Sequence, residues 1–344
     1  MKWVITGGAG FIGTNVVRRL VREGHHVIVL DNLSRRGVSE NIHFLQQYCK
    51  FGFISGDIRE IGPLKKMFEN HPDVDVVLHL AGQVAVTDSV VNPMNDFQVN
   101  AAGTFNVCEA IRQCSPTTIL LNASTNKVYG DLSHLKIVER KTRYELPEMV
   151  DGISEEQPVN FHTPYGCSKG CAEQYVRDYA RTYGLRTVSF RQSCIYGPHQ
   201  FGLEDQGWVA WFIIAAMLNK PLTIYGNGKQ VRDVLFVDDL VECYLGAVDQ
   251  IEKTSGEIYN IGGGPTNTCS LLELIEYLET VSAKTIRYRC GDWRAGDQRI
   301  FICDIRKAMR EFGWQPRTQF RDGIERLLQW VHASGSTIRK VLDG

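Results

Sequence analysis

The segment Gly7 to Gly13 reads Gly-Gly-Ala-Gly-Phe-Ile-Gly and constrains the fold more than any other part of the sequence. Lys2 to Thr6, just before it, has the apolar pattern of a buried strand, and apolar residues recur with helical spacing from Phe11 to Glu23. His26 to Leu30 again has the pattern of a buried strand. This order predicts a βαβ unit, in which two parallel strands are joined by a crossover helix.

The same alternation continues along the chain. It predicts strands at 52–55, 74–80, 118–123 and 186–191, and helices at 62–70, 94–114 and 165–183. Strands that alternate with helices are typical of the α/β class. We therefore expect a Rossmann-like, doubly wound parallel sheet over residues 1–191, with elements near 232–250 returning to it.

After residue 191 the sequence changes character. The segment 197–207 is rich in glycine and polar residues, and an apolar helix is predicted from Trp208. These features predict a smaller C-terminal α/β lobe over 192–344 that binds substrate. The charged stretch 133–157 is predicted to be a solvated loop, and its place between two motifs leaves the role of a lid open.

The three spaced glycines of the first turn have the pattern of a dinucleotide-binding site. Gly7 permits a tight turn, Gly10 lets a pyrophosphate approach the backbone, and Gly13 lets the helix pack on the strand. Asp31 stands where an acid hydrogen-bonds the adenosine ribose and repels a 2′-phosphate. The cofactor is therefore predicted to be NAD and not NADP. Arg35 and its neighbour are predicted to lie in a solvated loop, the alternative being that they hold a 2′-phosphate.

A second motif joins Tyr165 and Lys169, which lie four residues apart and so share one helical face. A tyrosine has an unperturbed pKa of about 10, so it needs nearby cations to act as a base near neutral pH. Lys169 and a nicotinamide ring would supply them. Ser124 and Thr125 end a predicted strand, at the sheet edge where open α/β sheets bind ligands. Together these residues predict a site for proton transfer.

Composition and charge exclude several classes of protein. Hydrophobic residues at 43% and charged residues at 22% exclude a disordered chain, and the net charge of −1 offers no overall field for nucleic acid or an acidic membrane. The longest apolar run, Trp208 to Leu218, is much shorter than the roughly 20 residues that span a bilayer. The first residues lack the pattern of a signal peptide, so we expect a cytoplasmic protein. The 10 cysteines are scattered without metal-site spacing, so we expect reduced thiols and no metal.

The motifs as a set resemble the extended short-chain dehydrogenase/reductase superfamily over nearly the whole chain. The matching segments are TGGAGFIG at 6–13, Asp31-Asn32, Gly56-Asp57-Ile58, His79-Leu80-Ala81, Asn100 with Gly103-Thr104, STNKVYG at 124–130, YGCSK at 165–169 and VRDVLFVDD at 231–239.

The resemblance implies a role for many individual residues. Thr125, Tyr165 and Lys169 would form a catalytic triad. The implied cofactor-binding residues are Gly7, Gly10, Phe11, Ile12, Gly13, Asp31, Asn32, Ser34, Asp57, Ile58, Leu80, Ala81, Gln83, Asn100, Tyr165, Lys169 and Gln192. The implied substrate-binding residues are Gln83, Ser124, Asn126, Cys194, Gln206, Arg232 and Arg294, with the two arginines as phosphate partners. The resemblance also implies a nucleotide-sugar substrate and a homo-oligomer, either a dimer or a tetramer.

Departures from the superfamily's patterns narrow the reaction. Sugar 4,6-dehydratases carry Asp-Glu directly after the threonine, because water elimination needs an additional acid and base. This chain has Asn126 and Lys127 there, which disfavours dehydration. Nucleotide-sugar 4-epimerases place an asparagine three residues before the glycine of a later segment, where this chain has Cys194, a weaker hydrogen-bond partner.

Several unbroken runs resemble one subgroup, the CDP-paratose 2-epimerases. The runs are AGQVAVTDS at 81–89, NPMNDF at 92–97, NKVYGDL at 126–132, DQGWVAWF at 205–212 and GNGKQVRDV at 226–234. This resemblance implies NAD-dependent epimerisation at C2 of a nucleotide-diphosphate hexose through a transient 2-keto sugar. A 4-epimerase or a reductase acting on UDP- or GDP-sugars remains an alternative, as does a non-catalytic NAD-responsive binding protein.

Overall fold

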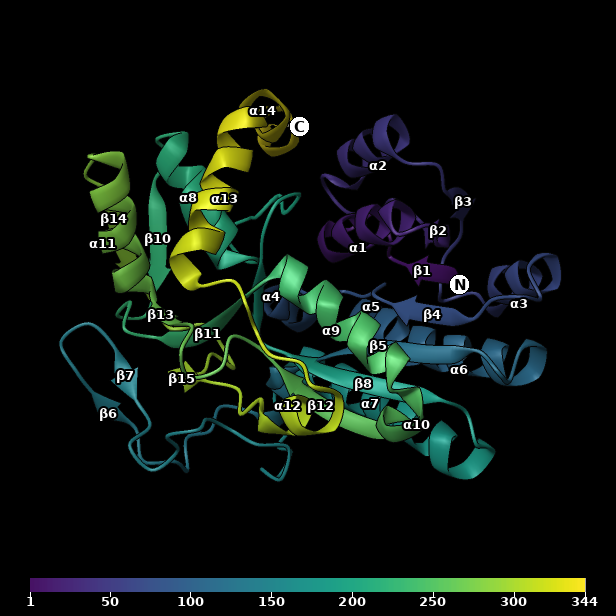
Figure 1. Ribbon diagram of the computed structural model, residues 1–344. Coiled ribbons are helices and arrows are strands. Elements are labelled where there is room, and N and C mark those ends of the chain that lie inside the picture. The colour runs from purple at the N-terminus through teal and green to yellow at the C-terminus, as the bar shows by residue number, and fades with distance from the viewer. Residues whose placement is uncertain (344) are drawn as a thin grey trace.

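A seven-stranded parallel sheet forms the larger lobe of the computed structural model, which describes residues 1–343 (Figure 1). Its strand order is β12-β8-β5-β4-β1-β2-β3, and all neighbours are parallel. The strands are β1 (Lys2–Thr6), β2 (His26–Asp31), β3 (Gly52–Ser55), β4 (Val76–His79), β5 (Ile119–Thr125), β8 (Thr187–Gln192) and β12 (Glu257–Ile261). The order reverses between β1 and β4, which is the point at which open α/β sheets bind ligands. The predicted fold class is confirmed.

Helices cover both faces of this sheet (Figure 1). One face carries α1 (Phe11–Arg22), α2 (Val38–Tyr48) and α9 (Val237–Asp249), and the other carries α3 (Ile61–Asn70), α6 (Gly103–Cys114) and α7 (Thr163–Tyr183). Successive side chains of a strand point to opposite faces. Trp3 and Ile5 of β1 therefore belong to one apolar core, and Val4 belongs to the other.

The smaller lobe has its own core around the almost wholly buried helix α8 (Trp208–Met217). Its sheet pairs β9 (Cys194–Tyr196), β11 (Val231–Phe236), β13 (Thr268–Ser270) and β15 (Ile300–Phe301), and a separate pair joins β10 (Leu222–Tyr225) to β14 (Tyr288–Gly291). The helices α11 (Leu271–Ser282), α13 (Phe320–Ala333) and α14 (Gly335–Asp343) contribute to this core. The short helices α10 (Ile251–Thr254) and α12 (Arg306–Phe312) pack instead on the larger lobe, where α12 contacts β12. No helix within residues 1–343 is both long and apolar enough to cross a membrane.

The predicted helix at 94–114 is wrong as one continuous element. The chain forms α5 (Pro93–Phe97), then a π-helical turn at Gln98–Ala102, and only then α6. The wider turn lets the side chain of Asn100 reach back toward the loop after β4, where it donates to the carbonyl of Gln83 at 2.9 Å. Hydrophobic spacing does not encode such a shift in backbone pairing.

The charged stretch 133–157 is not the solvated loop that its composition predicts. It contains a small hairpin, β6 (Val138–Glu139) with β7 (Tyr144–Glu145), and lies against the smaller lobe. Tyr144 and Ile153 are buried in the core, and Arg143 forms an ion pair with Glu273 at 2.9 Å. A few apolar anchors among many charged residues therefore fix the segment in place.

Candidate active site

Two adjoining cavities lie at the carboxyl ends of the sheet strands. The first, of about 640 Å³, extends over the ends of β1, β2 and β4, and the second, of about 310 Å³, lies beside the smaller lobe. Tyr165 and Gln206 line both cavities. The arrangement suits two ligands that meet at Tyr165.

The glycine-rich turn at one wall of the first cavity fits a dinucleotide. A Cβ at Gly7, where φ is +70°, would lie 2.6 Å from the backbone nitrogen of Ala81. A Cβ at Gly13 would lie 2.5 Å from the Cα of Gly8, so helix and turn are in direct contact. The N-terminus of α1 opens onto the cavity, where its free N–H groups and dipole favour a phosphate.

Asp31 ties this turn to the end of β2. Its carboxylate accepts hydrogen bonds from the backbone N–H of Ala9 at 3.0 Å and of Leu33 at 2.8 Å. Burial raises the pKa of Asp31, and the two N–H bonds oppose that shift by stabilising the carboxylate. The group that the sequence assigns to the ribose is thus held in place within the cavity lining.

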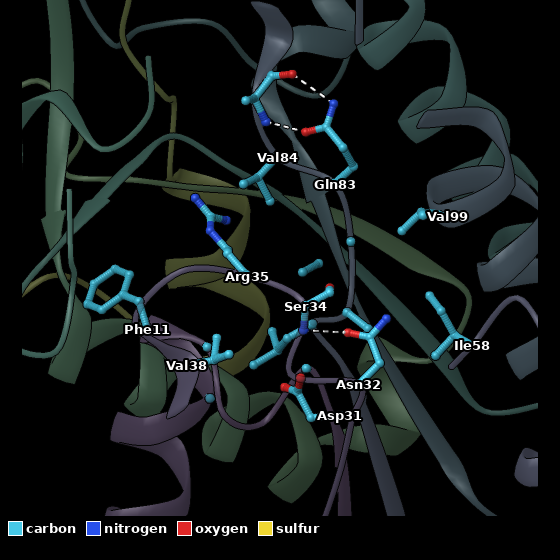
Figure 2. A pocket seen from close by; sticks show the side chains of 18 of the residues that line it. Phe11, Asp31, Asn32, Ser34, Arg35, Val38, Ile58, Gln83, Val84 and Val99 are labelled. Atoms are coloured by element: carbon cyan, nitrogen blue, oxygen red, sulfur yellow. Dashed lines mark hydrogen bonds between the residues drawn. The ribbon is translucent and has the colours of Figure 1, made fainter. Parts of the chain in front are cut away.

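Arg35 lies exposed in the loop after β2, as predicted, and it also contacts the smaller lobe. It lines the first cavity, and its guanidinium donates to the side-chain oxygen of Gln206, in a segment of the smaller lobe. Figure 2 shows Arg35 directed away from Asp31, the residue assigned to the ribose. The contact bridges the two lobes across the boundary between the cavities.

The far end of the first cavity has the features of an adenine site. Asp57 accepts a hydrogen bond from Asn32 at 3.0 Å and pairs with Arg59 at 2.7 Å, which lowers the pKa of Asp57 to about 2. Ile58 and Val99 present apolar side chains there (Figure 2). An apolar slot beside a carboxylate suits a flat base with exocyclic donors.

Most predicted cofactor residues line the first cavity. They are Gly7, Gly10, Phe11, Ile12, Gly13, Asp31, Asn32, Ser34, Asp57, Ile58, Leu80, Ala81, Gln83, Tyr165, Lys169 and Gln192. Asn100 does not line it and instead braces the loop behind, where its oxygen accepts from the N–H of Gln83 at 3.0 Å. The side-chain amide of Gln83 folds back onto the backbone of Ala85 (Figure 2). It also donates to Asp96 at 3.0 Å. The amide of Gln83 is thus engaged in hydrogen bonds within the protein and is not directed at a ligand.

The predicted triad gathers where the two cavities meet. Thr125 ends β5, while Tyr165 and Lys169 project from the first turns of α7. Burial raises the pKa of Tyr165 to about 12, and the neighbouring Thr125 hydroxyl opposes that shift. Burial also lowers the pKa of Lys169 to about 8. A tyrosine in this position needs a fixed positive charge beside it before it can lose its proton.

Ser124, predicted to bind substrate, lines the first cavity and not the second. Its hydroxyl donates to Glu173 at 2.7 Å, and Glu173 forms a buried ion pair with Arg191 at 2.6 Å. The predicted substrate residue is therefore part of a buried polar network beneath the triad.

Gln83, also predicted to bind substrate, lines only the first cavity. The remaining predicted substrate residues line the second cavity. They are Asn126, Cys194, Gln206, Arg232 and Arg294. Arg232 pairs with Asp297 at 2.9 Å, and the guanidinium of Arg294 stacks on the ring of Tyr225 at 3.8 Å. Two arginines along one wall suit a diphosphate, because guanidinium groups bind phosphate oxygens strongly.

Several residues of the second cavity escaped the sequence analysis. Lys127, treated there only as the absence of a carboxyl group, lines the cavity with Asp297. Trp208 donates its indole N–H to the sulfur of Cys194 at 3.3 Å and forms part of the same wall. The sequence offered one signal for this part of the cavity, which is that Lys127 lies two residues after Thr125. Asp297 and Trp208 gave none, because their partners in the cavity lie far away in the sequence.

Comparisons with known proteins agree with this geometry. A family model described as the NAD dependent epimerase/dehydratase family matches residues 3–262. The chain is 44% identical over 336 residues to a CDP-paratose 2-epimerase of Salmonella typhi, covering 96% of this chain and 99% of that protein.

Solved structures agree over almost the whole chain. Pal from Bacillus thuringiensis superimposes with a TM-score of 0.84 at 31% identity, covering 97% of this chain and 99% of that one. The UDP-glucose 4-epimerase of Thermus thermophilus, solved in complex with NAD, has a TM-score of 0.81 at 30% identity, covering 97% and 100%. The predicted cofactor, NAD, is confirmed at the level of the family. This protein belongs to the NAD-dependent epimerase/dehydratase family, within the extended short-chain dehydrogenase/reductases.

Proposed function

We propose that this protein inverts C2 of a nucleotide-diphosphate hexose of the CDP-paratose/CDP-tyvelose type. The observation that carries the proposal is the lining of the second cavity around Tyr165, where Thr125 is followed by Asn126 and Lys127. Neither residue supplies the carboxyl group that water elimination requires. Oxidation and reduction at a single carbon are what the triad can perform without it.

The choice of carbon rests on similarity. The 44% identical relative from Salmonella typhi is a CDP-paratose 2-epimerase, and the match covers nearly all of both chains. Cys194 in the substrate cavity, with the indole of Trp208 against it, supports a sugar pocket unlike that of ordinary 4-epimerases.

The residues around Tyr165 divide the chemical work. As a phenolate, Tyr165 accepts the proton of the C2 hydroxyl while Thr125 hydrogen-bonds the same oxygen. NAD, held by the glycine turn and Asp31 in the first cavity, would supply the acceptor and donor for the hydride at C2. The positive charge of Lys169 stabilises the phenolate. Arg232 and Arg294 keep the diphosphate in place while the 2-keto sugar turns its other face to the cofactor.

The direct test is to incubate the purified protein with a panel of CDP-, UDP- and GDP-hexoses and follow the ring protons by NMR. The proposal predicts that one substrate is converted to its C2 epimer. Inversion at C4 alone would make the protein a 4-epimerase. No conversion of any sugar, with NAD still bound, would favour a binding protein.

We also propose that the protein is a homo-oligomer that assembles through the helices packed around α7. α4 (Val86–Val91), α5 and α6 all contact α7. Exposed apolar side chains lie on this group of helices: Val91 is 86% exposed, Met94 64% and Phe97 52%. Such a patch is typical of a protein interface.

Sedimentation equilibrium tests the assembly. The wild type should be a dimer or tetramer, and Met94→Glu should dissociate it. Tyr48→Glu, at a 70% exposed position on α2, is the matched control and should leave the assembly intact. A monomeric wild type would contradict this proposal.

A further inference from the structure

Lys127 is a cation in the substrate cavity that the triad chemistry does not use. It stands two residues after Thr125, and its backbone N–H donates to the Thr125 hydroxyl oxygen at 3.2 Å. Its side chain is 19% exposed and lines the cavity together with Tyr165 and Arg232. The ammonium group is therefore held between the triad and the expected phosphate partner.

The contacts of this ammonium leave it short of negative charge. Its Nζ donates to the carbonyl of Gly296 at 3.1 Å and lies 3.9 Å from Oδ1 of Asp297. That same oxygen is taken by Arg232 at 2.9 Å. Two cations thus share one carboxylate oxygen, and Arg232 lies closer to it than Lys127 does.

An ammonium has three N–H donors, and within residues 1–343 only the carbonyl of Gly296 lies within hydrogen-bonding distance of the Lys127 Nζ. Burying a cation without an anionic partner is costly, so the cavity favours an anionic ligand at this point. The only anion in a nucleotide hexose is its diphosphate. A neutral sugar hydroxyl would be a weaker partner.

We propose that Lys127 binds the β-phosphate of the nucleotide sugar and thereby selects the carbon that faces Tyr165. This selection rests on the proposed function. The β-phosphate is joined to C1 through one oxygen, and C2 is bonded to C1, whereas C4 lies across the ring. An anchor close to Thr125 therefore brings the C1–C2 edge of the sugar to the triad and keeps C4 away from it.

The test compares nucleoside diphosphates with monophosphates, because only the diphosphates carry a β-phosphate. Dissociation constants of the NAD-loaded protein are measured by calorimetry for CDP and CMP, UDP and UMP, and GDP and GMP. The variants are Lys127→Met, which removes the charge at similar length, and Lys127→Arg, which keeps it. Lys136→Met removes a charge from an exposed pair and is the surface control.

Lys127→Met should weaken diphosphate binding roughly 10-fold or more and leave monophosphate binding nearly unchanged, as expected for a lost hydrogen bond to a charged group. Lys127→Arg should retain most of the preference for diphosphate over monophosphate, and Lys136→Met should retain all of that preference. An unchanged preference in Lys127→Met overturns the inference. An equal loss for both ligands also overturns it, because that pattern indicates a structural role.

Measuring the preference for diphosphate at several pH values adds a second test, because a purely structural role of Lys127 would not make that preference depend on pH. Burial and the nearby Arg232 lower the pKa of Lys127 to about 8, so the wild-type preference for diphosphate should fall as the pH rises through about 8 and above. The other groups facing Nζ are Asp297 on the segment before β15, Cys194 on β9 and Tyr165 on α7. Burial raises the pKa of Cys194, so its thiol is not charged near pH 8. Tyr165 is unchanged in Lys127→Arg, so that variant separates any titration of Tyr165 from the titration of Lys127. In Lys127→Arg the preference for diphosphate should no longer fall with pH. A fall that persists in this variant would contradict the inference.

These measurements need no turnover, so they separate the anchor from the proposed function. A diphosphate preference that depends on Lys127, together with inversion at C4, would keep the phosphate contact and reject both the selection of C2 and the proposed reaction. C2 inversion with no effect of Lys127 would reject the anchor alone. Failure to bind any of the six nucleotides would reject the nucleotide-sugar assignment and the anchor with it.

Discussion

The Nζ of Lys169 donates a hydrogen bond to the backbone carbonyl of Ala123 at 2.5 Å. This contact fixes the lysine of α7 against the end of β5, two residues before Thr125. The charge of Lys169 is therefore placed by the sheet itself, at the wall of the first cavity that Tyr165 also lines. In the proposed mechanism, proton transfer by Tyr165 depends on that charge.

The turnover number should fall at high pH. Burial lowers the pKa of Lys169 to about 8, so its ammonium is present below that pH and lost above it. Because the phenolate of Tyr165 needs the ammonium, kcat at saturating substrate should decline as the pH rises from about 8. Measuring kcat at saturation separates this effect from that of Lys127 on affinity. A kcat that keeps rising to about pH 10 would argue against the role of Lys169.

Tyr165→Phe should abolish most of the activity without disturbing the fold. The change removes the hydroxyl that accepts the proton but keeps the ring that is buried between the cavities. Loss of a general acid–base group typically costs about 10²–10⁴-fold in rate. Turnover and NAD content are the measurements, and near-wild-type turnover in a folded, NAD-loaded variant is the contradicting outcome.

NAD should bind at least roughly 10-fold more tightly than NADP, because a 2′-phosphate would meet the carboxylate of Asp31. Asp31→Ser should narrow this preference. It should also weaken NAD binding, since the carboxylate holds the N–H groups of Ala9 and Leu33. Fluorescence titration with both cofactors measures the effect.

Arg35→Gln is the control for cofactor choice, because the guanidinium of Arg35 is directed at Gln206. It should leave the ratio of NAD to NADP affinity unchanged. A wild type that prefers NADP, and loses that preference in Arg35→Gln, would show that the arginine is a 2′-phosphate ligand after all.

Breaking the buried pair beneath the triad should cost much stability. Glu173 is fully buried and bonds Arg191 at 2.6 Å, so Glu173→Gln leaves a buried guanidinium without its carboxylate. We expect a loss of about 3–5 kcal/mol in the free energy of unfolding. Glu148→Gln, in a pair with Lys136 whose side chains are both 67% exposed, should cost about 0–1 kcal/mol. Urea unfolding compares the two, and equal losses would contradict the account.

The first βαβ unit was predictable because its signals are local. The strand at Lys2–Thr6 has the bounds that the hydrophobic pattern predicts, and the helix after it, Phe11–Arg22, ends one residue before its predicted end. The spacing of the glycines and of Asp31 along the chain likewise predicts the cofactor site. These parts of the cofactor site follow from residues close together in the chain.

Other parts depend on partners far away in the sequence. The strand β12 pairs with β8 at the edge of the sheet, after the chain has passed through the smaller lobe. No local sequence pattern predicts that pairing. The side-chain amide of Gln83 points back onto Ala85 and donates to Asp96, while Asn100 bonds the backbone of Gln83. The environment of Lys127 is likewise set by Gly296 and Asp297. Such contacts exist only once the chain has folded.

The central claim is that the protein oxidises and reduces C2, and a substrate deuterated at C2 tests it most directly. Conversion in light water is followed by NMR and mass spectrometry. Because the hydride leaves C2 and returns to it within the site, the account predicts a C2-inverted product that keeps its deuterium. Loss of the label to solvent, or inversion at C4 with C2 unchanged, would contradict it.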